Sequence, residues 1–249
     1  RGPAAAGWGL LLEIHDPDSR LHRVVIPHGS LKGEGVEALS TLLDRGFVPK
    51  LGADRLLIEY LREQRPTARA RIVDRCGWHG GVFVLPDRAM SDADEPHLFA
   101  GPPGASPFKA QGTIDEWKSE VSARCTGNSR LIFAVGAAFA APLLALAGVE
   151  GGGFHYRGTS SDGKTTLLRV AASIAGPPEY VGRWRATANG LEAFASQHCD
   201  CPTMIDELAQ IDPKEAGEVC YMLSNGAGKA RASQTGAARP RATWRLLFQ

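Results

Sequence analysis

The sequence predicts an α/β fold in which a small α+β domain precedes a parallel β-sheet flanked by helices. Strand and helix patterns alternate through the second half of the chain, which is typical of a parallel sheet with helices around it. The first part instead combines strand pairs with two amphipathic helices. We therefore expect an N-terminal α+β domain at residues 1–98, a linker and helical connector at 99–128, and the sheet domain at 129–249.

The N-terminal part reads as a hairpin followed by two helices and a second strand pair. Residues 8–14 and 21–27 are apolar strand patterns joined by an Asp-Pro-Asp turn. Residues 35–46 and 53–66 carry apolar side chains at helical spacing and end at Gly and Pro. The strand patterns at 70–74 and 82–87 are expected to pair with each other.

An apolar run opens the second half of the chain. Residues 131–149 contain no charged side chain, and this length meets the criterion for a membrane span. The run is rich in Ala, contains Gly136 and Pro142, and leads directly into a strand. We expect a buried helix here and no membrane association, with a transmembrane helix as the alternative.

The strongest motif is GTSSDGKT, which has the G-x-x-x-x-G-K-[ST] spacing of a phosphate-binding loop. It lies between a predicted strand and a predicted helix, the context that this loop requires. Lys164 is expected to contact the β and γ phosphates of ATP, and the Thr165 hydroxyl to bind Mg²⁺. Asp162 is expected to turn its side chain outward. The predicted nucleotide-binding residues are Gly158, Thr159, Ser160, Ser161, Asp162, Gly163, Lys164, Thr165 and Thr166.

An Asp-Glu pair follows a short strand pattern at residues 202–208. Because α/β sheets bind ligands at the carboxyl ends of their strands, Asp206 is expected to hold Mg²⁺ and Glu207 to activate the attacking water. With Lys164 they are the predicted catalytic residues of a P-loop NTPase. The alternative is a helix N-cap with a capping acid.

Basic residues without any acid occupy the end of the chain. Lys229 and Arg231 lie in a Gly-rich turn and are predicted to contact a nucleic-acid backbone, although solvated cations are an equal alternative. Arg239, Arg241 and Arg245 are candidates for a finger that enters a neighbouring subunit's site. Trp184 is interpreted as a core residue rather than a base-stacking one.

The five cysteines are an odd, scattered set, which is typical of a reduced, cytoplasmic protein rather than a disulfide framework. His198, Cys199 and Cys201 form an HCDC cluster whose spacing is unusual for a metal site. We interpret the cluster as incidental.

Several long stretches resemble the bacterial domain-of-unknown-function family 927. They are FAVGAAFAAPLLAL, GGFHYRGTSSDGKTTLLRVAAS, WRATANGLE, DELAQIDPKEAGEVCYMLSNGAGKARA, WRLLF and, near the N-terminus, GWHGGVFVLPD. The resemblance implies a P-loop ATPase similar to ring-forming helicases and helicase-primase proteins of phages, plasmids and integrated elements. It implies ATP and Mg²⁺ as cofactors, single-stranded or forked DNA and a primase as partners, and a homo-oligomer. In such ATPases a further strand segment follows, so we expect a C-terminally truncated domain.

Two other functions remain open from the residues alone. One is a nucleotide-gated loader or regulator that binds DNA or protein without moving DNA. The other is a small-molecule kinase, which the Asp-Glu pair and the basic loop disfavour.

Overall fold

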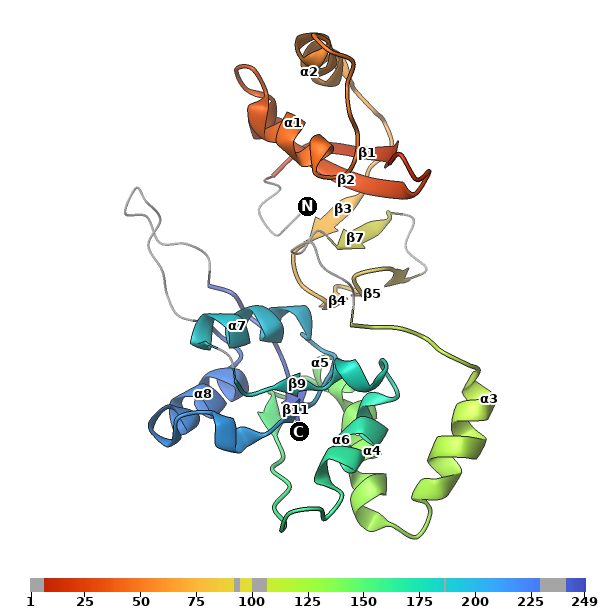
Figure 1. Cartoon of the computed structure of the whole chain (residues 1–249), viewed down its shortest axis with the longest axis vertical. Helices are drawn as coiled ribbons and strands as arrows, with labels where there is room; N and C mark the ends of the chain where they lie inside the picture. Colours follow the sequence, from red (N-terminus) through yellow and green to blue (C-terminus); the bar gives the residue numbers. More distant parts are fainter. Residues whose placement is uncertain (1–6, 92–94, 100–106, 186, 229–240) are drawn as a thin grey trace. The chain divides into compact units, whose positions relative to one another are not determined.

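The computed structural model describes residues 7–91, 95–99, 107–185, 187–228 and 241–249 (Figure 1). The chain divides into two compact units. The first comprises residues 1–73 and 94–100, and the second comprises residues 74–93 and 101–249. Helices combine with both parallel and antiparallel strand pairs, so the mixed α/β class is confirmed.

The first unit is built on an antiparallel hairpin. β1 (Gly9–His15) pairs along its whole length with β2 (Leu21–Pro27), as the strand patterns predict. A short 3-10 helix η1 (His28–Leu31) leads to α1 (Val36–Leu43), and α2 (Asp54–Glu63) follows. Alternate hairpin residues and one face of each helix form a common core, which contains Leu10, Val24, Ile26, Leu42, Ile58 and Leu61.

The second strand pair of the N-terminal half differs from the prediction. β3 (Arg71–Val73) pairs in parallel with β7 (His97–Phe99) in the first unit. β5 (Val82–Val84) pairs instead with β4 (Gly77–His79) and β6 (Ala89–Met90) in the second unit. The prediction was wrong because residues 77–79, which contain Gly and His, form the hairpin partner of β5 rather than a turn.

Short parallel strands form the centre of the second unit. β8 (Gly152–Gly153) pairs with β12 (Leu247–Phe248), which pairs with β10 (Pro202–Thr203). One residue further on, β11 (Ile205–Asp206) pairs with β9 (Gly182–Arg183). Main-chain bonds from Ile205 N to Gln249 O and from Gln249 N to Thr203 O hold these pairs together, at 2.8 and 2.9 Å. Residues 202–206 thus join both parallel pairings in the order β9, β11/β10, β12, β8.

Helices lie on two sides of these strands (Figure 1). α7 (Ala188–Gln197) and α8 (Pro213–Asn225) pack on one side, and α4 (Ser129–Ala140) and α6 (Lys164–Ala172) on the other. The local signals for α8 are clear, since Asp212 caps it, Pro213 opens it and Gly226, at φ 67°, ends it. The remaining helical segments are α3 (Ile114–Trp117), α5 (Leu144–Ala147), the π-helical η2 (Lys118–Ser122), and the 3-10 turns η3 (Ala123–Cys125), η4 (Ala141–Leu143), η5 (Pro178–Tyr180) and η6 (Leu208–Gln210).

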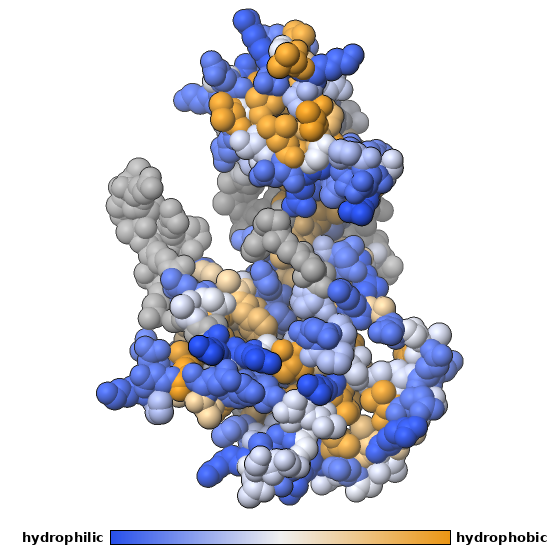
Figure 2. Space-filling view, in the orientation of Figure 1, coloured by the Kyte–Doolittle hydropathy of each residue, from blue (hydrophilic) through white to orange (hydrophobic). Residues whose placement is uncertain are grey.

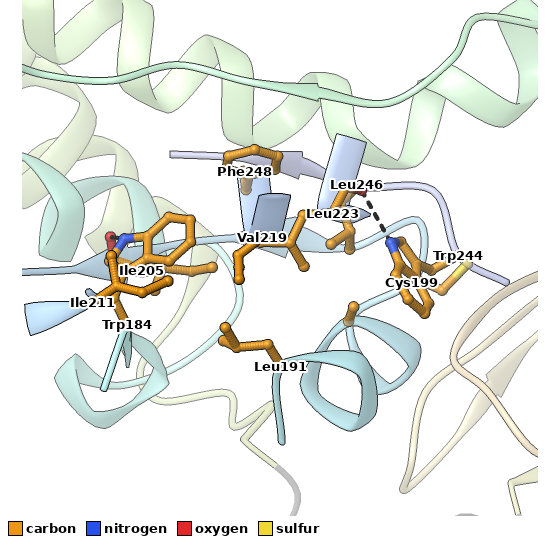
Figure 3. Packing of buried hydrophobic residues seen from close by; sticks show 11 residues of the cluster. Trp184, Leu191, Cys199, Ile205, Ile211, Val219, Leu223, Trp244, Leu246 and Phe248 are labelled. Carbon is orange, nitrogen blue, oxygen red and sulfur yellow. Dashed lines mark hydrogen bonds between the residues drawn. The ribbon is translucent and has the colours of Figure 1, made fainter. Parts of the chain in front are cut away.

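A hydrophobic cluster ties α7 and α8 to the strands. Figure 3 shows Leu191, Val219 and Leu223 facing Trp184 and Phe248. Trp244 also belongs to this cluster, and its indole N–H donates to Leu223 O at 3.0 Å. Each of these strands is only two residues long. The packing of this cluster therefore helps to hold the ends of the strands in position.

The apolar run from residue 131 is only partly buried. α4, η4 and α5 (Leu144–Ala147) form one helical stretch, Ser129–Ala147, that is long and apolar enough to cross a membrane, and 22% of its most apolar window is buried. The small residues Ala134, Ala137 and Ala138 pack inward, whereas Phe133 and Phe139 are exposed. The expectation of a buried helix is therefore correct for one face only.

Candidate functional site

The GTSSDGKT segment forms a loop that opens directly into a nine-residue helix, α6. Gly163 precedes that helix in the left-handed conformation, at φ 80°, and Ser161 also has a positive φ of 67°. The helix N-terminus has no side-chain cap. Its first-turn N–H groups are therefore available to an anion, in the geometry that favours phosphate binding.

Asp162 folds onto the loop rather than outward. Its carboxylate accepts hydrogen bonds from Thr159 N at 2.6 Å and from Thr159 Oγ1 at 2.9 Å, because these two donors lie within its reach. The bonds lower the pKa of Asp162. Gly158 permits the arrangement, since a Cβ there would lie 2.7 Å from the carboxylate. The acid thus braces the start of the loop, and its outward orientation was wrongly predicted.

Lys164 lies across the same loop. Its ammonium donates to Gly158 O at 3.0 Å and to Thr159 O at 2.5 Å. A lysine held by main-chain carbonyls can exchange those bonds for phosphate oxygens without moving its backbone. The side chain is thereby kept beside the α6 N-terminus.

The loop and the Asp-Glu segment meet at one hydrogen bond. Thr165 Oγ1 donates to Asp206 Oδ2 at 2.8 Å, although the residues are 41 positions apart. A hydroxyl and a carboxylate oxygen are ligand types that Mg²⁺ uses together with phosphate oxygens and water. The donor set present therefore fits a magnesium–nucleotide complex.

Glu207 follows Asp206 in a strained backbone conformation. Its φ is 63°, which is unfavourable for a residue other than glycine and is found most often at functional sites. Its side chain caps no backbone N–H of η6 and instead accepts a hydrogen bond from Gln210 Nε2. The helix-capping alternative therefore does not describe this carboxylate, which is exposed to solvent.

These residues share a cavity of about 570 Å³. Lys164, Asp206 and Glu207 line it, together with residues that sequence reasoning did not assign to a site. Among the latter, Tyr156 donates its hydroxyl hydrogen to Gln249 Oε1 at 2.5 Å, and Gln249 Nε2 donates to Ala134 O at 3.0 Å. Burial raises the pKa of Tyr156 to about 12, so the phenol stays protonated. The signal for Gln249 was its position directly after the last apolar strand.

The predicted basic residues are less well placed. Lys229, Arg231 and Arg239 lie outside the described residues. Arg241 Nε donates to Gly228 O at 2.9 Å, and Arg245 forms an ion pair with Asp200 at 3.0 Å, so neither side chain lies at the cavity. Trp184 is buried, donates to Ile205 O at 3.1 Å and lines the cavity from the core side, which agrees with its interpretation as a core residue.

The HCDC cluster is buried rather than open to a ligand. The His198 ring stacks on Phe194, and Cys199 and Cys201 are almost fully covered. Burial raises the pKa of both thiols, which keeps them protonated and unreactive. Within the described part of the chain, no group of three or more His, Cys, Asp or Glu side chains is arranged to hold a metal.

Comparisons with known proteins agree with this architecture. A solved structure described as "SCCmec type IV Cch - active helicase" superposes with a TM-score of 0.67 at 18% sequence identity. The similarity covers 96% of this chain and 49% of that one, so the chain spans about half the length of that helicase. At this identity the match shows a shared fold. A comparison with curated proteins gives no match.

A family comparison covers almost the whole sequence. The family described as "Domain of unknown function (DUF927)" matches residues 1–243. This agrees with the resemblance carried by the loop, the Asp-Glu segment and the GWHGGVFVLPD stretch. The chain belongs to the DUF927 family.

Proposed function

We propose that the chain is the nucleotide-binding part of a P-loop ATPase that acts on DNA as a helicase or translocase. The observation that carries the proposal is the 2.8 Å bond between Thr165 and Asp206, which brings the loop and the Asp-Glu segment into one site. The parallel strand order β9, β11/β10, β12, β8 supports a P-loop sheet, with the loop after β8, Asp206 at the end of β11 and Glu207 directly after it.

Each residue has a defined part in the proposed reaction. Main-chain N–H groups of residues 160–166 bind phosphate oxygens, while Lys164 leaves its loop carbonyls to neutralise the β and γ phosphates. Thr165 and Asp206 hold Mg²⁺, and Glu207 accepts a proton from the attacking water. The bound Mg²⁺–ATP supplies the phosphoryl group that is transferred to water.

The proposed partner is single-stranded or forked DNA. The solved structure that matches is a helicase, and the chain corresponds to about half of it, so the activity of the whole protein is part of the proposal. Assembly into a homo-oligomeric ring and cooperation with a primase are further expectations of the same proposal. Both are consistent with a protein that acts in the cytoplasm on a mobile DNA element during its replication.

A second candidate function is a nucleotide-gated loader or regulator without motor activity. The bond from Gln210 Nε2 to the Glu207 carboxylate favours it, because that bond occupies one of the two carboxylate oxygens that could accept a proton. This protein would bind ATP tightly, hydrolyse it slowly and separate no strands.

One experiment distinguishes the two. ATP hydrolysis by the complete protein is measured with and without single-stranded DNA, beside strand separation on a forked duplex. The motor proposal predicts faster hydrolysis with DNA and loss of the duplex. If hydrolysis is slow at the same rate with and without DNA and the duplex stays intact, the motor proposal is wrong and the loader or regulator remains.

A further inference from the structure

A cationic hollow lies in the first unit, between η1 and the carboxyl end of α2. Its volume is about 390 Å³. The residues that line it are His28, Leu31, Lys32, Arg62 and Arg65. No acidic side chain is among them, and Figure 2 shows strongly hydrophilic residues beside apolar ones on the surface over α1 and α2.

Arg62 is fixed in this hollow by main-chain oxygens. Its Nε and Nη2 donate to Leu31 O at 2.9 and 2.5 Å, and Nη2 also donates to Gly33 O. A guanidinium has five N–H donors, and these bonds use the three on Nε and Nη2. The two donors on Nη1 remain for a ligand. The carbonyl dipoles hold the side chain in place without cancelling its charge.

Arg65 is held in a similar way. Its Nη1 donates to Arg62 O at 2.5 Å and to Gln64 O at 2.8 Å, which leaves the donors on Nε and Nη2. Lys32 is exposed on the opposite wall. In the described part of the chain, none of these three cations forms an ion pair with a carboxylate.

Several other arginines of the same unit pair with carboxylates. Arg55, on the same helix α2, contacts Glu59 at 2.9 Å, and Arg20 contacts Asp18 at 3.5 Å. Arg23 contacts Glu13 at 3.0 Å. What distinguishes the hollow is that three cations without a carboxylate partner among the described residues line one place, which leaves a concentration of uncompensated positive charge.

The chemistry of the walls selects phosphate as the ligand. Guanidinium groups with free, oriented donors bind phosphate oxygens in pairs, and a lysine adds a point charge. Leu31 is the one apolar residue among those that line the hollow, so the specific contacts available to a ligand come from the charged side chains. An open hollow with cations on two walls fits successive phosphates of a chain better than one isolated ion.

We propose that this hollow binds the phosphate backbone of single-stranded DNA, through Lys32, Arg62 and Arg65. The proposal rests on the proposed function for its partner, DNA, but not on the ATP site. It assigns to the first unit a role in holding the strand on which the second unit acts.

The test is equilibrium binding of a fluorescent single-stranded oligonucleotide to the full chain, without nucleotide, at several salt concentrations. The double variant Lys32→Ala/Arg65→Ala is compared with Arg20→Ala/Arg55→Ala, which removes the same charge from paired arginines. The first should weaken binding by about 2- to 10-fold. It should also lower the slope of log K against log salt by about 0.7 for each phosphate that is no longer neutralised, whereas the control should change neither. Lys32→Ala alone, with an unchanged melting temperature, guards against misfolding of the double variant.

Three results would overturn the proposal. The first is an equal loss in both double variants, which would indicate only total charge. The second is DNA binding that is insensitive to Lys32 and Arg65. The third is binding of pyrophosphate at the hollow without any binding of the oligonucleotide, which would identify a site for a small ligand. Lys164→Ala should bind the oligonucleotide as the wild type does. If this variant loses ATP binding and keeps DNA binding, the two proposals are tested separately. A wrong assignment of the nucleotide site can then be distinguished from a wrong assignment of the hollow.

Discussion

Two acidic residues with positive φ flank the same strand segment, residues 202–206, and the surroundings of their carboxylates differ. Asp200, at φ 56°, precedes the segment, and Glu207, at φ 63°, follows it. The Asp200 carboxylate is 2% exposed and accepts hydrogen bonds from Trp78 N at 3.1 Å and Arg245 Nη1 at 3.0 Å. The Glu207 carboxylate is exposed and accepts one from Gln210.

The difference separates an acid whose partners are all structural from the acid that we propose as the general base. Asp200 ties β4 to the strand segment, and Gly77 is required there because a Cβ would lie 2.6 Å from its carboxylate. A buried carboxylate with all its partners in place has no capacity left for a substrate, and removing one member of such a group destabilises the fold. Glu207, at the carboxyl end of a parallel strand and beside a cavity, has that capacity.

The largest effect is expected at the exposed acid. Glu207→Gln should reduce ATP hydrolysis by about 100-fold or more, because it removes the proposed general base, while ATP stays bound. Single-turnover hydrolysis and nucleotide binding, measured on the same preparation, check this. Unchanged turnover would assign the proton transfer to another group.

The buried acid should affect stability instead. Asp200→Ala should lower the free energy of unfolding by about 1–3 kcal/mol, since it removes the buried acceptor of Trp78 N and the partner of Arg245, whose side chain is 36% exposed. Glu207→Ala should change it by about 0.5 kcal/mol or less. Urea denaturation of both variants measures the contrast, and equal losses would remove the distinction between the two acids.

A pH effect on stability should come from His198, in the buried HCDC cluster. Burial lowers its pKa from 6.5 to about 4, its Nδ1 hydrogen bonds to Phe194 O at 2.8 Å, and its Nε2 has no hydrogen-bond partner among the described residues. The folded protein therefore keeps the ring neutral, while the unfolded chain takes up a proton below pH 6.5. Stability should be full above pH 6.5 and fall toward pH 4, by up to about 1.4 kcal/mol per pH unit.

The control for this effect is His198→Phe, which preserves an aromatic ring but removes the titration. Denaturation of the wild type and the variant across this pH range should give a flatter curve for the variant. Parallel curves would show that other groups cause the acid sensitivity.

The smallest effect is expected for the basic segment after α8. Lys229→Ala with Arg231→Ala should weaken oligonucleotide binding several-fold and lower its salt slope by about 0.7 for each phosphate released. Salt titrations measure the slope directly. An unaltered slope would identify both residues as solvated cations.

Features encoded locally could be predicted from the sequence. The motif from Gly158 to Thr165 predicts a loop that opens into a helix, as α6 shows, and Pro213 with Gly226 bounds α8 correctly. Features that need distant residues could not. The pairing of β3 with β7 spans a whole intervening hairpin, and Asp200 bonds to Trp78, which lies 122 positions away.

The cationic hollow was missed for the same reason. Arg62 reaches main-chain oxygens 31 and 29 positions away, and no sequence pattern marks that contact. The orientation of Asp162 was missed on a smaller scale, because a charge argument alone favours an outward carboxylate. The two donors of Thr159 decide the matter, and their positions depend on the shape of the loop.

The most direct test of the proposed nucleotide site is the affinity of this chain for Mg²⁺–ATP, by calorimetric titration of the wild type, Lys164→Ala and the matched control Lys214→Ala. Lys214 lies on α8 and does not line the cavity. We expect one site in the wild type and the control, dependent on Mg²⁺, and loss of binding in Lys164→Ala. Binding that survives Lys164→Ala, or that needs no Mg²⁺, would contradict the proposed site.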